Sequence, residues 1–408
     1  MDYETFARAI QEDAALRRKQ SLQPVGGTGD KIFPPTYPEE RRGQGPRHVF
    51  ERRHIEGREI WCVLVDSVQS QANRLEEVLL AAARDAVITL PYVTVDFSGA
   101  ELSGLTEITS LEAPHRVYDA ILRDSLLDGV PFMKSPLGRR LAEAKPGDAT
   151  ALLEASPNAL LFGAWHSTGE GGGIGAKFPR CLVSEIIAID VPVDDGPADR
   201  QTGEIEVRNA GRRTGSRIDP LGILRRVEVF KSAEGWDTVK ERAGSGAKSA
   251  RPSEINHGNI APSVQSLGVT CAYVEHMAVL SFAGLRRLRF GGGERDTAGR
   301  ALLGALGILA LTEQDRRGYA LRSRCDLVCD GRAPLELVHA DGATKRLEID
   351  IATARALYDA SLDAARRAGF QIAAEPIRLR PQDKLVEIVR RSQRLALAGE
   401  GGEADPQP

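Results

Sequence analysis

Apolar residues recur at regular spacing along the chain, and the clearest example is a strand followed by a helix. Residues 59–65 are rich in apolar and β-branched side chains, which predicts a strand. Residues 68–82 then place an apolar side chain at every third or fourth position, which predicts a helix with one narrow apolar stripe. Asp66 is expected to cap this helix, with Gln69 three residues later in capping-box register.

The same spacing rules predict the other elements of the chain. Helices are expected after Pro114, which suits a first helical position, and at 3–19, 294–311, 352–368 and 384–397. Strands are expected at 87–97, 159–165, 181–193, 269–282, 321–329 and 335–350. Because 181–193 is almost continuously apolar, it is expected to be a central strand covered on both faces.

Three stretches lack the spacing of a helix or a strand. Residues 26–53 are rich in Gly, Pro and charge, and irregular loops of that length are usually functional or disordered. From 194 to 253 the composition shifts to Gly, Arg, Ser and Asp, which predicts an insertion that projects from the fold. Residues 398–408 are expected to be a disordered tail, so 1–193 and 254–397 together would form the main body.

Composition excludes several classes of protein. The chain has 408 residues, of which 42% are apolar, so its body can bury a core and is not disordered. With 54 basic and 57 acidic residues the net charge is −3, which excludes a uniformly basic nucleic-acid coat. No run is long and apolar enough for a membrane helix, and the first residues do not resemble a signal peptide. We therefore expect a cytoplasmic protein without a membrane partner.

The cysteines are odd in number and scattered, which indicates reduced thiols. Cys325 and Cys329 form a CxxxC spacing with only His339 nearby, so a metal site is one interpretation and buried strand thiols are the other. The expectation is no metal and no cofactor.

Basic residues concentrate locally despite the negative total. Seven bases stand against two acids between residues 208 and 231, which suits a phosphate backbone, although such a run can also be a solvated face. The arginines expected to contact nucleic acid in this insertion are Arg208, Arg212, Arg213, Arg217, Arg225 and Arg226.

The polar face of the helix after residue 66 is a second candidate. Helix N-termini bind phosphates readily, and its first turns carry mostly uncharged donors and one arginine; the alternative is a solvated face. The residues are Ser67, Gln69, Ser70, Gln71, Asn73 and Arg74. His115 and Arg116 are further candidates, for which an ion-pair ladder with Asp119 and Arg123 is an equal alternative.

A glycine-rich loop at 166–175 fits neither the GxxxxGK[ST] nor the GxGxxG phosphate motif. Its flexible backbone could still approach a partner closely, with Trp165 and His166 before it and Lys177 and Arg180 after it. The alternative is a mobile surface hairpin.

No sequence motif of a hydrolase or nuclease is present. His257, within Asn256-His-Gly-Asn259, is the best single candidate for a general base, although such a loop is more typical of a turn. The segment 285–290 mixes Leu with Arg286, Arg287 and Arg289, so these arginines could share one surface. With few aromatic residues, the chain is expected to hold an RNA backbone more than to stack bases.

Several of these segments resemble the backbone subunits of the type I-G (formerly I-U) CRISPR interference complex, which are Csb-type members of the RAMP superfamily. The resemblance runs from about Lys31 to Phe290. It rests on the segments 65–76, 111–116, 119–125, 161–167, 184–185, 256–259 and 285–290.

The resemblance implies an α+β fold, with a ferredoxin-like or RRM-like palm, helical insertions and a projecting thumb at 194–253. It also implies that several copies polymerise along one CRISPR RNA, beside other Cascade subunits, and present the guide to target DNA without cutting it. The candidate residues named above then become contacts to the guide backbone. Two alternatives stay open: an endoribonuclease of the same superfamily that uses His257 or His166, and an assembly subunit that contacts mainly protein.

Overall fold

A computed structural model gives the fold and describes residues 1–38, 47–166, 175–193, 213–217, 220–258, 260–265 and 267–397. For 213–217 and 260–265 only the backbone is described. The expected disordered tail lies outside the described residues, as do residues 167–174 of the glycine-rich loop.

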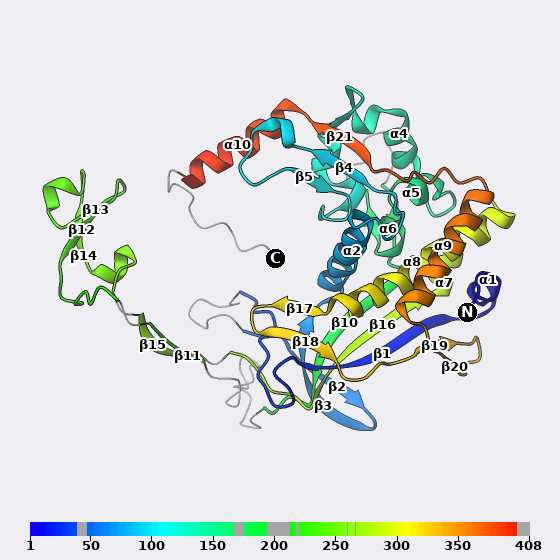
Figure 1. The fold of residues 1–408 in the computed structure, drawn as a ribbon, viewed down its shortest axis with the longest axis horizontal. Helices are drawn as coiled ribbons and strands as arrows, with labels where there is room; N and C mark the ends of the chain where they lie inside the picture. The colour runs from blue at the N-terminus through cyan, green and yellow to red at the C-terminus, as the bar shows by residue number, and fades with distance from the viewer. Residues whose placement is uncertain are drawn as a thin grey trace.

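A large antiparallel sheet lies in the lower part of the molecule in Figure 1, below α8 and α9. Its order is β17-β18-β1-β16-β10-β3-β2, and β19 with β20 extends it along the outer part of β1. The strands are β1 (Ala15–Pro24), β2 (Phe50–Ile55), β3 (Arg58–Asp66), β10 (Leu182–Ile189), β16 (Tyr273–Ser281), β17 (Tyr319–Arg322), β18 (Cys325–Cys329), β19 (Leu335–Val338) and β20 (Thr344–Leu347).

The connections between these strands define the fold. The chain runs from β1 through α2 to β10, returns after residues 190–272 as the neighbouring β16, and passes through α8 and β17 to β18. The order β18-β1-β16-β10 with two helical crossovers is the split βαββαβ arrangement of a ferredoxin-like unit. The predicted α+β fold with a ferredoxin-like palm is confirmed. The helices here are α1 (Tyr3–Glu12), α2 (Val68–Arg84), α7 (Phe282–Arg286), α8 (Gly293–Arg317) and α9 (Ile351–Arg367).

Helix α8 lies at the centre of the main core and is buried almost all round. Alanine and glycine let its neighbours approach closely: a Cβ at Gly304 would meet the Phe6 ring at 2.8 Å. The stripe predicted for α2 also faces this core, with Leu75 and Leu79 at 1% and 0% exposure. Helices α1, α2 and α9 therefore pack around α8 on the sheet.

A second sheet, in the order β5-β4-β21-β6-β7, joins the region that follows α2 to the last part of the chain. Strand β21 lies near the C-terminus but pairs in parallel with β4, so the last part of the chain closes the region inserted after α2. Its strands are β4 (Val93–Asp96), β5 (Glu107–Thr109), β6 (Ser125–Leu127), β7 (Val130–Pro131) and β21 (Ile377–Pro381). Around it lie α3 (Ala120–Arg123), α4 (Pro136–Glu143), α5 (Thr150–Ala155), α6 (Pro157–Leu161) and α10 (Asp383–Leu397).

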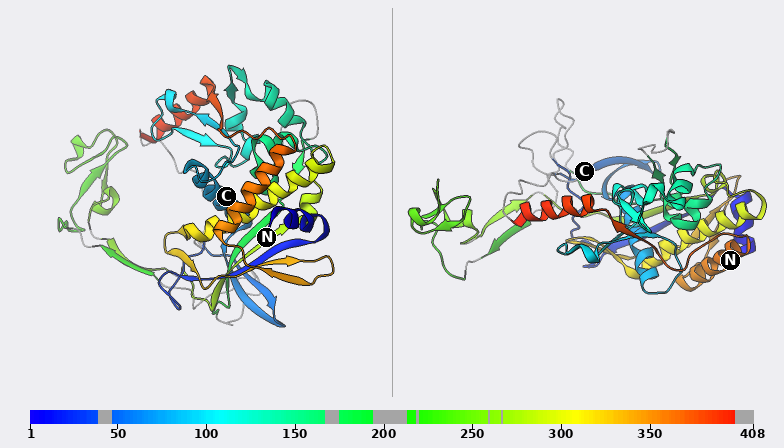
Figure 2. Two further views of the ribbon diagram at one scale, coloured as in Figure 1. Left: turned by 45° about the vertical axis from the view of Figure 1, so that its right-hand side comes forward. Right: turned by 90° about the horizontal axis from the view of Figure 1, so that it is seen from above.

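The described parts of residues 213–265, which we call the arm, extend away from the rest of the molecule in every view (Figures 1 and 2). An antiparallel pair, β11 (Arg213–Arg217) and β15 (Ile260–Gln265), carries a small sheet of three strands at its end. These strands are β12 (Val229–Lys231), β13 (Trp236–Asp237) and β14 (Lys248–Ala250). The expected projecting insertion is thus present, and its return strand β15 lies beyond residue 253.

The predicted helix at 3–19 is wrong in its second half. The helix ends at Glu12, and residues 15–24 form β1, in which Leu16, Arg18, Gln20 and Leu22 all face inward. Two of these four inward positions are polar, so the sequence does not show the alternation of apolar and polar residues that is typical of a strand. Arg18 is tolerated there because Asp315 pairs with it at 2.5 Å.

Three other predictions also need correction. Residues 159–161 of the expected strand at 159–165 belong to helix α6 and only its last two residues form a strand, because a short, fully buried apolar run suits either structure. Only 93–96 of the expected strand at 87–97 is a strand, and the expected helix after Pro114 is a 3-10 turn (Arg116–Tyr118) followed by the short α3. Helix α2 is capped by Ser67, whose Oγ accepts from Ser70 N–H, and not by Asp66.

Among the described residues, no helix is long and apolar enough to span a bilayer.

Candidate nucleic-acid interface

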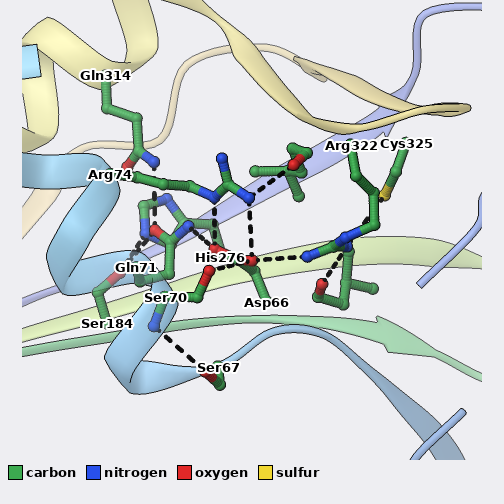
Figure 3. Close-up of polar contacts among 12 residues, drawn as sticks. Asp66, Ser67, Ser70, Gln71, Arg74, Ser184, His276, Gln314, Arg322 and Cys325 are labelled. Atoms are coloured by element: carbon green, nitrogen blue, oxygen red, sulfur yellow. Dashed lines mark hydrogen bonds and ion pairs between the residues drawn. The ribbon is translucent and has the colours of Figure 1, made fainter. Parts of the chain in front are cut away.

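Asp66, at the end of β3, is the centre of a polar cluster beneath the first turns of α2 (Figure 3). Its carboxylate has no exposed surface and accepts hydrogen bonds from Ser70 Oγ at 2.8 Å and Gln71 Nε2 at 2.6 Å. Arg74 of α2 and Arg322 of β17 add charged hydrogen bonds, each at 2.9 Å. Two arginines on one carboxylate leave this buried cluster with a net positive charge.

The cluster continues across the sheet through a chain of buried hydrogen bonds. Gln71 Oε1 accepts from Ser184 Oγ of β10 at 3.2 Å, and Ser184 Oγ lies 2.6 Å from His276 Nε2 of β16. On the other side of the ring, Nδ1 lies 3.4 Å from the Arg18 guanidinium. Nδ1 also lies 3.1 Å from the Tyr319 hydroxyl, so both ring nitrogens have polar partners within the core.

Burial holds the pKa of His276 well below 6.5, and the charge of Arg18 adds to this effect. The ring is therefore neutral at pH 7, with one donor and one acceptor nitrogen. Ser184 and His276 have the spacing of a nucleophile and its base, but they are 3% and 0% exposed. Because no substrate could reach them, we interpret the pair as a structural part of the sheet.

The cluster changes the interpretation of the polar face of α2. Ser70, Gln71 and Arg74 turn toward Asp66, and Ser67 caps the helix, so these groups are already bonded. Gln71 is 0% exposed and cannot contact a phosphate in this conformation, which corrects its assignment as an RNA contact. Only the expected contacts Gln69 and Asn73 are fully exposed on this face. The face holds α2 against β3 more than it presents donors to a ligand.

Arg116 is buried and does not form the ladder with Asp119 and Arg123. Its guanidinium instead makes two hydrogen bonds of 2.7 Å to Glu76 of α2, and a third, of 3.0 Å, to the Gly163 carbonyl. This fork holds Arg116 at a φ of +55°, a strained value for a residue with a side chain. An RNA contact by Arg116 is therefore corrected to a structural role, whereas the neighbouring His115 is exposed.

The residues around the glycine-rich loop form two contacts. The first, between Trp165 and Lys177, is exposed, and the second places buried His166 against Tyr118. Trp165, 55% exposed, stacks with Lys177, whose Nζ lies 4.6 Å from the ring centre, in the short hairpin of β8 (Ala164–Trp165) and β9 (Lys177–Phe178). His166 is 6% exposed and stacks on Tyr118 at 4.9 Å. Trp165 and Lys177 can thus meet a ligand together, and His166 cannot without a rearrangement.

Arg180 lies behind this hairpin, within electrostatic range of Arg116 and Glu76. Burial lowers its pKa, the charge of Arg116 lowers it further, and its Nε is buried without a hydrogen bond to the described residues. Because this Nε is buried, it cannot meet a phosphate in this conformation, and it does not support Arg180 as an RNA contact.

Arg286, which ends α7, does not share one surface with Arg287 and Arg289, which follow it. Arg286 donates to the carbonyls of Ile10 at 2.7 Å and Asp13 at 2.7 Å, and it therefore caps the end of α1. Arg289 is 61% exposed but pairs with Asp296 at 2.9 Å. Arg287 is exposed, and its guanidinium makes no hydrogen bond or ion pair to the described residues. Only Arg287 keeps an unoccupied guanidinium, so Arg286 is corrected from an RNA contact to a helix cap.

Arg286→Ala is expected to lower the free energy of unfolding by about 2–3 kcal/mol, because it removes charged hydrogen bonds to carbonyls that α1 cannot satisfy itself. Arg287→Ala, one residue away, should change it by less than about 0.5 kcal/mol. Urea-induced unfolding of both variants measures the difference. Equal midpoints would refute the capping role of Arg286.

The arm brings together two candidates that are far apart in the sequence. Exposed Arg225 and Arg226 line one open groove with Asn256 and His257, in a cavity of about 1070 Å³. The groove also receives Arg251, and His257 packs edge-on against Trp236 at 5.5 Å, itself 47% exposed. Arg208, Arg212 and Asn259 lie outside the described residues, and only the backbone is described at Arg213 and Arg217.

Among the described residues, no group of His, Cys, Asp and Glu could hold a metal ion. Burial raises the pKa of Cys325 and of Cys329 to about 11, so both are protonated thiols at pH 7. Sequence reasoning placed Asp66 at the start of α2 but missed Arg322 as its partner, because only the fold brings β17 to the end of β3. It also missed Arg251 and Trp236, whose position after a basic run was the one available signal.

Comparison with known proteins gives one sequence match. Residues 16–193 match the model of the family described as "CRISPR-associated protein GSU0053 (Cas_GSU0053)". A search of curated proteins gave no match. The crystal structure of Csc2 from Thermofilum pendens aligns with 96% of this chain and 80% of that chain, at 10% identity. Its TM-score of 0.30 is too low to support an argument about fold or function.

The family match begins in β1, includes α2 and the second sheet up to β7, and ends after β10. It therefore includes much of the palm and leaves out the arm. The match confirms that the resemblance found in the sequence is to a CRISPR-associated family. The part of this chain from 16 to 193 is accordingly similar to CRISPR-associated proteins.

Proposed function

We propose that this protein is a CRISPR RNA-binding backbone subunit of a type I-G interference complex, in which copies of it line up along one guide and hold it for pairing with target DNA. The observation that carries the proposal is the match of residues 16–193 to a CRISPR-associated family. The other partners would be further Cascade subunits, and the protein would act in the cytoplasm without a cofactor.

The distribution of available bases supports contact through the arm. In the palm, Arg74, Arg116 and Arg286 are bonded to groups of the protein itself. On the arm, Arg225 and Arg226 are exposed beside a groove and have no carboxylate partner among the described residues. Exposed guanidinium groups bind phosphates without reading base sequence, so binding should depend on salt and little on RNA sequence.

A non-catalytic role is part of the proposal. His166 is buried against Tyr118, and the Ser184–His276 pair is closed to solvent, so neither can act on RNA in this conformation. His257, half-buried at the arm groove, is the histidine best placed for the alternative, an endoribonuclease. Glu228 and Glu254 line the same groove, and the His257 ring packs edge-on against Trp236.

A filter-binding assay tests the proposal by measuring the affinity of the purified protein for a single-stranded RNA from 50 to 500 mM salt. We expect similar affinity for unrelated sequences and a log–log slope of about −0.7 per phosphate contacted. No binding at low salt would refute RNA binding and favour the alternative of an assembly subunit. Cleavage of a guide precursor that is lost in His257→Ala while binding persists would refute the non-catalytic role.

A further inference from the structure

The point where the arm joins the body contains a buried histidine that the proposed RNA contacts do not use. His48 is 5% exposed and lies just before β2, at the end of the long irregular segment noted in the sequence. Its Nδ1 lies 3.0 Å from the Pro35 carbonyl, and its Nε2 accepts from Gly268 N–H at 2.9 Å. Gly268 follows β15 by three residues, where the arm returns to the sheet.

Neighbouring contacts join the same three segments. Ile32 and Val269 exchange two backbone hydrogen bonds, of 2.9 and 2.8 Å, and both side chains are 1% exposed in the core. Phe33 N–H donates to the Arg324 carbonyl at 3.0 Å, in the turn between β17 and β18. The segment 31–35 is therefore fixed between that turn and the end of the arm. We call these contacts with His48 the clasp.

The fit at Gly268 is close and depends on glycine. Its φ is +83°, in the left-handed region, and a Cβ there would lie 2.8 Å from the Phe33 ring. Arg324 in turn covers that ring, with its guanidinium carbon 4.9 Å from the centre. The path of the chain leaving the arm is thus set by one turn and one ring face.

We propose that His48 is a positioning residue: its neutral imidazole fixes the base of the arm to the body and thereby sets the direction in which the arm projects. The hydrogen bonds require this form, because Nδ1 donates to a carbonyl while Nε2 accepts from an N–H. Protonation of Nε2 would place its N–H against the Gly268 N–H and break that hydrogen bond. The contacts of the clasp do not depend on the proposed function. Only the role of the arm's direction rests on that function.

The charges around His48 also favour the neutral form of its imidazole. Burial lowers the pKa of His48 from 6.5, and the positive charge of Arg322 on β17 lowers it further, against the Pro35 carbonyl, which raises it. Arg324 faces the clasp from the turn, Arg47 precedes His48, and no carboxylate among the described residues acts on the ring. Because the unfolded chain binds the proton more readily, the clasp is stable above pH 6.5 and weakens as the pH falls below it.

Hydrogen exchange of the full chain without RNA tests the clasp. After correction for the intrinsic rate, protection of residues 267–274 should fall roughly tenfold from pH 7.5 to pH 5.5, the effect of losing one buried hydrogen bond. His48→Gln keeps an acceptor for Gly268 but no titrating group, so its protection should vary little with pH. His54→Ala, at an exposed histidine of β2, is the matched control and should behave as wild type.

His48→Ala should lose protection of 267–274 at both pH values while the rest of the sheet stays protected. Unchanged protection in His48→Ala, or a pH response retained in His48→Gln, would overturn the proposal. If His48→Ala does not fold, the wild-type and His48→Gln series still decide. RNA affinity is measured separately, so a protein that fails to bind RNA but shows this pH response would contradict the proposed function alone.

Discussion

Asp66→Ala should be among the most destabilising single substitutions in this protein, lowering the free energy of unfolding by about 3–5 kcal/mol. The carboxylate is fully buried and receives Ser70, Gln71, Arg74 and Arg322, so its removal leaves two guanidinium groups without their counter-charge. Because Arg74 and Arg322 are 22% and 26% exposed, water compensates in part, and the lower end of the range is expected.

Asp85→Ala provides a matched control, because Asp85 also pairs with an arginine at 2.9 Å but is 61% exposed. It should cost less than about 1 kcal/mol. Urea-induced unfolding compares the two variants, and Arg322→Met in the Asp66→Ala background should recover stability by removing an unpaired charge. Similar midpoints for Asp66→Ala and Asp85→Ala would show that the cluster does not hold α2 to the sheet.

Replacing Arg225 and Arg226 together by Ala is expected to weaken RNA binding roughly threefold to tenfold at low salt and to reduce the log–log salt slope by about 1.4, two contacts at 0.7 each. The physical reason is that both side chains are exposed at the arm groove and make no ion pair among the described residues. Unrelated RNA sequences should lose affinity alike, because phosphate contacts do not read bases. Filter binding over a salt series gives both quantities.

The control removes two bases from another exposed site. Lys384 and Arg391 on α10 are 63% and 73% exposed and pair with Asp124 and Glu387. Their double replacement by Ala changes the net charge equally but should leave the slope unchanged. If both double variants lower the slope equally, binding depends on total charge and not on the arm; if only one RNA sequence loses affinity, backbone contact is the wrong mechanism.

Several features could be predicted from the sequence because they depend on local pattern. The apolar spacing of α2 and the run that becomes β10 gave elements close to those observed, and the composition shift after 193 indicated the projecting insertion. Each signal lies within a few residues of the element that it predicts.

The candidate site was less predictable, because the sequence does not distinguish an arginine that binds a phosphate from one that binds a carboxylate. Arg74, Arg116 and Arg286 were expected to face RNA, and the structure gives them Asp66, Glu76 and the end of α1. Arg116 is separated from Glu76 by forty residues, and Arg286 from Ile10 by 276. At such a separation in the sequence, the fold decides which residues become partners. Local spacing carries no information about that choice.

The sequence by itself determined the class of fold, the arm and a resemblance to CRISPR-associated proteins, because periodicity, composition and motifs are properties of the chain. Only the tertiary structure decided which bases remain available to a ligand. Buried carboxylates and helix ends must be satisfied first, since leaving them unpaired costs more free energy than a surface contact returns. The bases that the folded palm does not need, foremost Arg225 and Arg226 at the arm groove, are the ones that remain available to the proposed RNA ligand.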